Sequence, residues 1–147
     1  MNKTIGRNRS YSGASVMLKN LLPQLCQELA LAAPSLDEHK VHHLKIGPFE
    51  IALKDLEPGY YFYSNIGPLP TKKKEDFLMM VMKANFLGQG TGGGALGLKE
   101  DESSLTLSLS LPYEMNYKAF KDNLEEFANF VDYWKKETVR HETEAKN

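Results

Sequence analysis

The stretch ANFLGQGTGGGALGL, residues 84–98, decides how the rest of the chain is interpreted. Five of the eleven glycines lie within residues 88–94. A glycine run costs backbone entropy on folding, and proteins use one where φ is positive or where another segment approaches closely. An apolar segment precedes the run, and an alternating leucine segment follows it. The run is therefore either a phosphate-binding loop, which would indicate an enzyme, or a structural joint in a binding protein.

The glycines match the spacing G-x-G-x-x-G at Gly88, Gly90 and Gly93. A dinucleotide-binding loop follows a strand and opens a helix, so that the helix N-terminus meets the pyrophosphate. Here the sequence predicts the reverse order, a helix before the run and a strand after it. The spacing of a P-loop is also present, but Gly94-Ala95 stands where Lys-Ser/Thr is needed. The run favours helix termination at Gly88 followed by a tight turn.

The segment before the glycines predicts a helix that Thr71 caps and that ends near Leu87. Its middle, FLMMVM at residues 77–82, is apolar nearly all round, and such a helix needs cover on more than one side. A second copy of the chain would provide that cover, and methionines suit an interface that can repack. We expect the dimer interface to contain Leu78, Met79, Met82, Phe86 and Leu87.

Two strands and a helix are predicted after the glycines. Residues 95–98 form a short strand, and leucines alternate with hydroxyl residues over 105–111, which predicts one apolar and one polar face. The last helix begins near Asn116, and charge dominates from Lys135 onward. Apolar residues recur along this helix at spacings of three and four, at Tyr117, Phe120, Leu124, Phe127, Val131 and Trp134.

The N-terminal half predicts one helix and three strands. Helical spacing of apolar residues indicates a helix over 21–33, with Asn20 as N-cap and Pro23 in the first turn. Strands are expected at 40–46, 49–53 and 60–66, separated by Gly and Pro turn signals. The order α-β-β-β-α-β-β-α predicts an α+β domain with an antiparallel sheet packed by helices. That single domain spans 16–140, between a mobile basic tail at 1–15 and a frayed charged tail at 141–147.

Composition narrows the class of protein. The chain has 147 residues, a formal net charge of −1 and a pI near 6.4, so it has no overall attraction to nucleic acid or an anionic membrane. Cys26 is the only cysteine, which fits a reducing cytosol. We find neither a signal peptide nor an apolar run long enough to span a bilayer. We expect a soluble cytosolic protein without membrane insertion.

Candidate chemical groups are few. His42 and His43 are adjacent, so strand alternation sends them to opposite faces and they do not easily share a metal ion. Cys26 lies on the apolar face of the first helix, which favours a core position over a nucleophile. The aromatic strand at 60–66 lacks the interleaved basic residues of a nucleic-acid surface. The sequence therefore predicts no catalytic residue, metal site, cofactor or nucleic-acid partner.

Two segments carry a resemblance to a known family: Gly67-Pro68-Leu69-Pro70, and ANFLGQGTGG at residues 84–93. With the apolar helix between them, they resemble the signature of the Tir-chaperone (CesT) family, the class I type III secretion chaperones. The similarity covers about residues 21 to 134. Its most specific part is Asn-x-x-Gly-x-Gly-Thr-Gly-Gly at residues 85–93.

The resemblance implies the same α-β-β-β-α-β-β-α fold, a homodimer built largely through the second helix, and a small cytoplasmic bacterial non-enzyme linked to virulence. Such chaperones bind the extended N-terminal segment of a secreted effector through apolar grooves and added strand pairing. The secretion ATPase and the export apparatus are further candidate partners. The effector-binding groove is expected to contain Leu25, Leu29, Phe49, Ile51, Leu53, Tyr61 and Tyr63.

Three features depart from the family pattern: the nearly neutral charge, the basic tail at 1–15 and the lysine run at 72–74. They leave open which cargo is bound and how charge contributes to docking. Two other functions also stay open. One is a nucleotide-dependent enzyme that uses the glycine run, and the other is a regulatory interaction module of the same fold that binds a secretion-apparatus or transcription protein.

Overall fold

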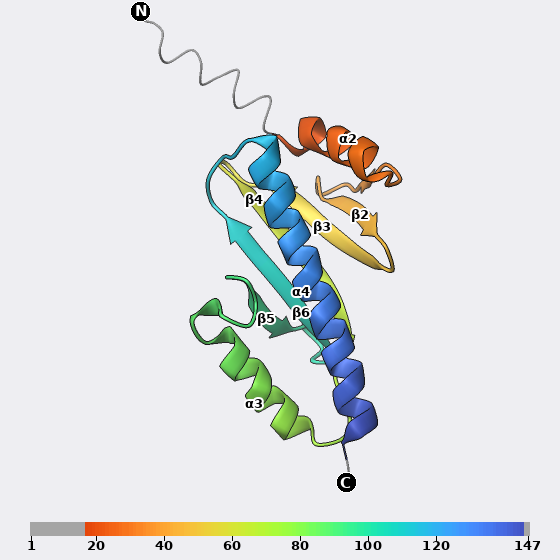
Figure 1. Cartoon of the computed structure of the whole chain (residues 1–147), viewed down its shortest axis with the longest axis vertical. Helices are drawn as coiled ribbons and strands as arrows, with labels where there is room; N and C mark the ends of the chain where they lie inside the picture. The colour runs from red at the N-terminus through yellow and green to blue at the C-terminus, as the bar shows by residue number, and fades with distance from the viewer. Residues whose placement is uncertain (1–16, 146–147) are drawn as a thin grey trace, which may run out of the picture. The chain divides into compact units, whose positions relative to one another are not determined.

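The structure, a computed structural model, describes residues 17–145. The tail predicted at 1–15 and the last two residues of the predicted C-terminal tail lie outside the described residues. Within them the helices are α2 (Leu18–Leu29), α3 (Lys74–Asn85) and α4 (Tyr117–Glu144), and the 3-10 turn η1 (Phe86–Gly88) follows α3 (Figure 1). The strands are β1 (Ser35–Leu36), β2 (His42–Ile46), β3 (Phe49–Asp55), β4 (Tyr60–Pro68), β5 (Ala95–Leu98) and β6 (Ser104–Leu111).

The six strands form one sheet in the order β1-β2-β3-β4-β6-β5. The pairs β1–β2, β2–β3 and β5–β6 are antiparallel. In their register Leu44 opposes Ile51, and Leu96 opposes Leu107. These findings confirm the α+β class and the predicted element order. The additional strand is β1, whose two residues are too few to show a period of two.

The chain divides into two compact units. Among the described residues, unit 1 comprises 17–61 and 111–123, and unit 2 comprises 62–110 and 124–145. Both β4 and α4 therefore contribute residues to each unit.

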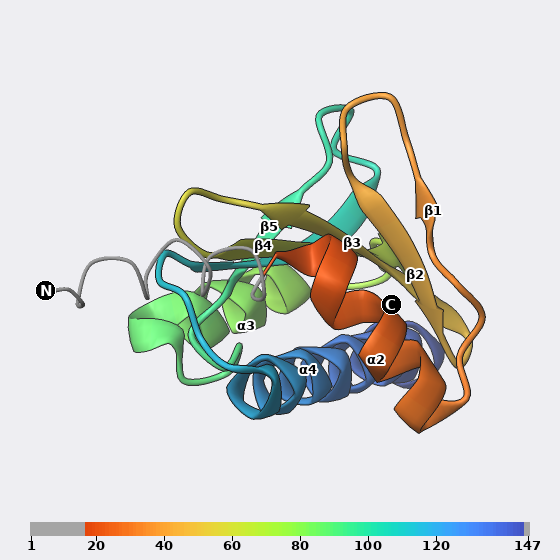
Figure 2. The same cartoon turned by 90° about the horizontal axis from the view of Figure 1, so that it is seen from above.

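The core of unit 1 lies between α2 and the strands beside it (Figure 2). The ring centroids of Tyr60 and Phe120 lie 5.2 Å apart in an edge-to-face arrangement. Burying one Leu or Ile side chain contributes roughly 1.5–3 kcal/mol to the free energy of folding. The buried aliphatic side chains here include Leu18, Leu21, Leu22, Leu25, Leu44, Ile51 and Leu53.

The core of unit 2 confirms the aromatic stripe predicted for the last helix. Phe127 of α4 lies edge-on against Phe62 of β4, with ring centroids 5.6 Å apart. Phe77 of α3 lies 5.2 Å from the ring of His141 in the same geometry. Leu124, Phe127, Val131 and Trp134 are buried, as are Phe77, Val81, Leu96, Leu105 and Leu107.

The first helix begins and ends earlier than predicted. It starts at Leu18, whose N–H donates to Asp55 Oδ1 at 3.1 Å. The N-cap residue is Met17, and Asn20 lies inside the helix. Ala30 ends the helix in a left-handed conformation with φ of 55°. The sequence could not reveal this start because the capping carboxylate comes from a residue 37 positions away.

The end of α4 also differs from the prediction, because the helix continues to Glu144. Glu142 explains this extension: its carboxylate accepts the Thr71 N–H at 2.8 Å, the Thr71 hydroxyl at 2.7 Å and the Lys72 N–H at 3.1 Å. Thr71 is thus tied to α4 and does not cap α3, which begins at Lys74. Residues 141–144 are helical where the charge pattern suggested a frayed tail.

Candidate functional site

The glycine run joins α3 and η1 to β5, in the helix-then-strand order that the sequence predicts. Asn85 fastens this joint. Its Nδ2 donates to the Leu96 carbonyl at 2.9 Å, and its Oδ1 accepts the Leu96 N–H at 2.8 Å. The buried Thr91 hydroxyl donates to the Gly94 carbonyl at 2.6 Å. Trp134 Nε1 donates to the Gly90 carbonyl at 2.9 Å.

Close approach explains two of the glycines. A Cβ on Gly94 would lie 2.4 Å from the Ser108 carbonyl oxygen, and one on Gly92 would lie 2.6 Å from the Phe130 ring. The backbone N–H of Gly93 donates within the run, to the Gly88 carbonyl at 3.0 Å. A phosphate loop instead needs N–H groups that point outward at the mouth of a helix. The geometry is that of a structural joint.

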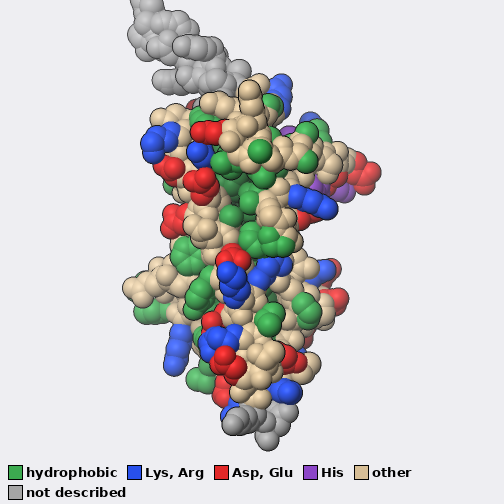
Figure 3. All heavy atoms as spheres, turned by 45° about the vertical axis from the view of Figure 1, so that its right-hand side comes forward, with side chains coloured by type: hydrophobic (Ala, Val, Ile, Leu, Met, Phe, Trp, Pro, Cys, Tyr) green, Lys and Arg blue, Asp and Glu red, His purple; other side chains and the backbone are tan. Residues whose placement is uncertain are grey.

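The histidines of β2 do point to opposite faces. His42 pairs with Leu53, whereas His43 pairs with Ala52. His43 Nε2 lies 2.9 Å from Asp37 Oδ2, and its Nδ1 lies 3.0 Å from Glu50 Oε2. Both partners accept, so the arrangement fits the imidazolium form, which donates from both nitrogens. Figure 3 shows histidine side chains next to acidic ones at one margin of the molecule.

Hydrogen bonds within this cluster shift the pKa values of its side chains. The hydrogen bond from His43 lowers the pKa of Asp37 to about 2. The same bond, assisted by Glu50, raises the pKa of His43 above its usual value. No three His, Cys, Asp or Glu side chains among residues 17–145 are grouped to hold a metal ion. The cluster thus ties the turn before β2 to β3.

Exposed apolar side chains lie along α3 and η1 of unit 2, two elements that Figure 1 shows beside β5. Phe77 and Val81 face the core, whereas Met79, Met82, Phe86 and Leu87 are 58–76% exposed. Met79, Met82 and Phe86 recur at spacings of three and four, so they follow one helical face. We call these four exposed residues the α3 face. Contiguous exposed apolar surface of this kind marks interaction sites in soluble proteins.

The structure therefore brings together four of the five residues predicted for a dimer interface. The fifth, Leu78, is half-buried. Leu98 at the end of β5 is a further exposed leucine of unit 2, and the sequence analysis missed it because its strand is only four residues long.

The residues predicted for an effector groove do not form one surface. Leu25, Ile51 and Leu53 have no exposed side-chain surface and pack inside unit 1. Tyr61 and Tyr63 alternate along β4 with the buried Tyr60, Phe62 and Ser64, so they lie on its opposite face and are half-buried. Leu29 and Phe49 are half-buried as well.

An apolar pocket of about 320 Å³ lies instead between α2 and the edge of the sheet. Leu36 of β1 is 60% exposed at its rim. The thiol of Cys26 donates to the Ala32 carbonyl at 3.6 Å, and burial raises its pKa, which keeps it neutral. We call this pocket the α2–β1 pocket. Its lining residues are Lys19, Leu22, Pro23, Cys26, Ala33, Pro34, Leu36 and His42.

The pocket adjoins a strand edge. In the sheet of residues 17–145, β1 is one of the two edge strands and pairs only with His42 and His43 of β2 (Figure 2). The rest of β2, Leu44 to Ile46, pairs with β3 and has no strand on its other side among these residues. An open edge presents backbone N–H and C=O groups that another strand can pair with.

The comparisons with known proteins agree on the fold. The model of the Tir chaperone protein (CesT) family matches residues 20–135, more than half of the chain. No curated protein matches the sequence.

No helix among residues 17–145 combines the length and apolar character that crossing a membrane requires.

Three solved structures illustrate the likeness. A chain of the ExsC–ExsE complex has 14% identity and a TM-score of 0.66, covering 82% of this chain and 92% of that one. A chain of the complex of the Yersinia pestis type III secretion chaperone SycH with a fragment of YscM2 has 16% identity and a TM-score of 0.58. The match covers 80% of this chain and 97% of that one. YbjN of E. coli, described as a proposed transcription regulator, has 16% identity and a TM-score of 0.60. The match covers 85% of this chain and 92% of that one. At identities this low, the likeness establishes the fold alone.

Proposed function

The chain belongs to the Tir chaperone protein (CesT) family, and on this basis we propose that it is a type III secretion chaperone. It binds the extended N-terminal chaperone-binding segment of one or more effector proteins and keeps that segment soluble and secretion-competent. It works as a homodimer in the bacterial cytoplasm, and the secretion ATPase or export apparatus is a further candidate partner.

One observation carries the effector-binding proposal: the α2–β1 pocket lies directly beside an open strand edge. An extended peptide gains backbone hydrogen bonds by adding to such an edge, and it gains specificity when alternate side chains enter a neighbouring pocket. Leu36, Leu22 and Pro34 line the pocket with apolar surface. An apolar side chain of the effector would therefore lose its water contact there while its backbone pairs with the edge.

The homodimer proposal rests on the α3 face. Covering Met79, Met82, Phe86 and Leu87 removes four large apolar side chains from water, and each contributes roughly 1.5–3 kcal/mol when fully buried. Methionines also adapt their shape to a partner surface. The two proposed surfaces lie on different units.

The effector proposal is tested by co-expression. Partners are first isolated from the native cell. The first ~100 residues of each secreted partner, a length within the usual size of a single domain, are then expressed with and without the chain. The solubility of the partner segment is compared between the two. We expect the partner segment to remain soluble only with the chain. We expect Leu36→Asp to weaken binding at least ~10-fold, about 1.4 kcal/mol. Tyr113→Asp, which changes another exposed residue of unit 1, is the matched control. Equal affinities for both variants would place the binding site elsewhere.

The proposed chaperone is not an enzyme and needs no cofactor or ATP. The glycine run is held by Asn85, Thr91 and Trp134 as a joint, which supports this part of the proposal. Calorimetric titration with ATP and NAD is the direct test, and we expect no heat of binding. Saturable heat with either nucleotide would favour the nucleotide-dependent enzyme instead.

A second candidate function is a regulatory interaction module that binds a secretion-apparatus or transcription protein. The similarity to YbjN favours it, because that protein is described as a proposed transcription regulator. Co-purification separates the two functions. Secreted proteins among the bound partners support the chaperone, whereas apparatus or transcription proteins alone support the regulator.

A further inference from the structure

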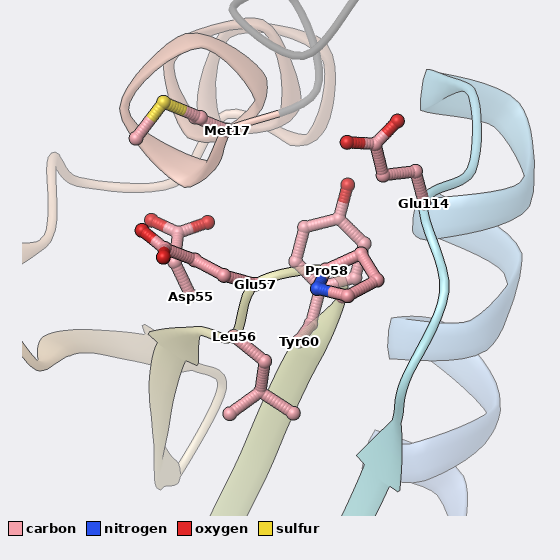
Figure 4. Close-up of a pocket in the computed structure, with 8 residues that line it drawn as sticks. Met17, Asp55, Leu56, Glu57, Pro58, Tyr60 and Glu114 are labelled. Atoms are coloured by element: carbon pink, nitrogen blue, oxygen red, sulfur yellow. The ribbon is translucent and has the colours of Figure 1, made fainter.

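A second groove of unit 1 has a different character from the α2–β1 pocket. It measures about 280 Å³ and lies between the start of α2 and the turn that joins β3 to β4 (Figure 4). Pro58 and Leu56 provide apolar surface beside the buried ring of Tyr60, and Met17 closes one side. We call it the β3–β4 groove. The remaining lining residues are Asp55, Glu57, Gly59 and Glu114.

Three carboxylates surround this groove. Figure 4 shows those of Asp55 and Glu57 on one side of Tyr60 and that of Glu114 on the other. One carboxylate oxygen of Asp55 already accepts a hydrogen bond, from the Leu18 N–H. Glu57 and Glu114 are exposed, and neither forms an ion pair with another of residues 17–145. A negative rim around an apolar floor suits a side chain with an apolar stem and a cationic head, such as Arg or Lys.

The chain itself supplies such side chains. Residues 1–16 contain Lys3, Arg7 and Arg9 and no acidic residue. They join the described structure at Met17, which is itself part of the groove wall. Arg9 precedes Met17 by eight residues, and a chain of that length spans up to ~26 Å. A short tether raises the effective concentration of its own segment to about millimolar, so even a weak contact is populated.

We propose that the basic segment at residues 3–11 docks in the β3–β4 groove of its own chain, with an arginine side chain between Glu57 and Glu114. This assigns a place to one of the three features that depart from the family pattern. The docked segment lies at the start of α2, the helix that also lines the α2–β1 pocket.

Trypsin digestion of the full-length protein tests this proposal. Trypsin must draw an arginine side chain into its own pocket, so docking slows cleavage after Arg7 and Arg9. Rates are measured relative to a free peptide of residues 1–16. The test variant is Glu57→Gln/Glu114→Gln, and the control is Glu125→Gln/Glu126→Gln, which neutralises two exposed acids of α4. Asp55 is left intact because it caps α2.

We expect cleavage to be about fivefold faster in the test variant than in the wild type or the control, which corresponds to the loss of an exposed ion pair. High salt should accelerate cleavage of the wild-type protein to the same level, because it screens exposed charges. Equal rates in all three proteins and no effect of salt would overturn the proposal. Protection that grows with protein concentration would also overturn it, because the segment would then bind another copy of the chain.

Discussion

Asn85 and Leu96 form two hydrogen bonds with each other. The Leu96 N–H donates to Asn85 Oδ1 at 2.8 Å, and Asn85 Nδ2 donates to the Leu96 carbonyl at 2.9 Å. The side-chain amide thereby takes the place of a strand partner for Leu96. It links the end of α3 to β5 across the glycine run. This link gives the glycine run an architectural role.

Replacing Asn85 by Leu should lower the free energy of unfolding by about 1–3 kcal/mol, because both backbone groups of Leu96 lose their partner in a part-buried position. Urea unfolding followed by circular dichroism measures this change. Gln89→Leu alters an exposed residue of the same joint and is the control. If the two variants were equally stable, the Asn85 amide would have no structural role.

Gly94→Ala should lower the free energy of unfolding by at least ~2 kcal/mol, since its Cβ would lie 2.4 Å from the Ser108 carbonyl oxygen. Gly97→Ala is the matched control, because its Cβ would meet only the Thr106 hydroxyl at 3.5 Å, an ordinary contact. Thermal unfolding distinguishes the two. A similar loss in both variants would contradict the assignment of the close contact to Gly94 alone.

The cluster of His43, Asp37 and Glu50 predicts a dependence of stability on pH. The pKa of His43 is raised in the folded state, so its contribution is complete below about pH 6.5, its usual unfolded value, and is lost as the pH rises through the folded value. The pKa of Asp37 is lowered to about 2, so its contribution is complete above about pH 4 and is lost on acidification. The cluster therefore stabilises unit 1 most between these limits.

Melting temperatures between pH 5 and 9 test the His43 part of this prediction. The wild-type value should fall more steeply on going from pH 6 to 8 than that of His43→Gln. His39→Gln, which alters an exposed histidine nearby, should retain the wild-type profile. Identical profiles for wild type and His43→Gln would refute the assignment.

The α3 face predicts that assembly depends on Met82, which is 70% exposed. Met82→Glu should convert a dimer into a monomer in sedimentation velocity, because a charge buried in an apolar interface lacks a partner. Val139→Glu changes an exposed apolar residue of α4, 63% exposed, and this variant should remain dimeric. A wild-type protein that sediments as a monomer would contradict the homodimer.

Much of the fold could be predicted because its signals are local. Alternating leucines at 105–111 define β6, and the spacing of aromatic residues defines the buried stripe of α4. The start of α2 could not be predicted, since Asp55 caps it from a distant strand. The end of α4 depends likewise on contacts of Glu142 with Thr71 and Lys72.

The candidate surfaces were predicted unequally for a related reason. The α3 face could be found because a helix apolar on all sides must leave part of itself uncovered. Residues of an effector-binding groove are harder to predict from the sequence, because Leu25, Ile51 and Leu53 have the same apolar pattern whether they face a partner or the core. The structure places all three in the core. Leu36 gave no signal, since a two-residue strand has no period.

Backbone amide hydrogen exchange on the complex with an effector segment tests the central claim most directly. The account predicts that amides of β1 and of residues 44–46 exchange more slowly in the complex than in the free protein, because the effector adds a strand to that edge. Amides of η1, which belong to the α3 face, should be unchanged on binding. Unchanged exchange along β1 and β2, with protection confined to α3 and η1, would contradict effector binding at the α2–β1 pocket.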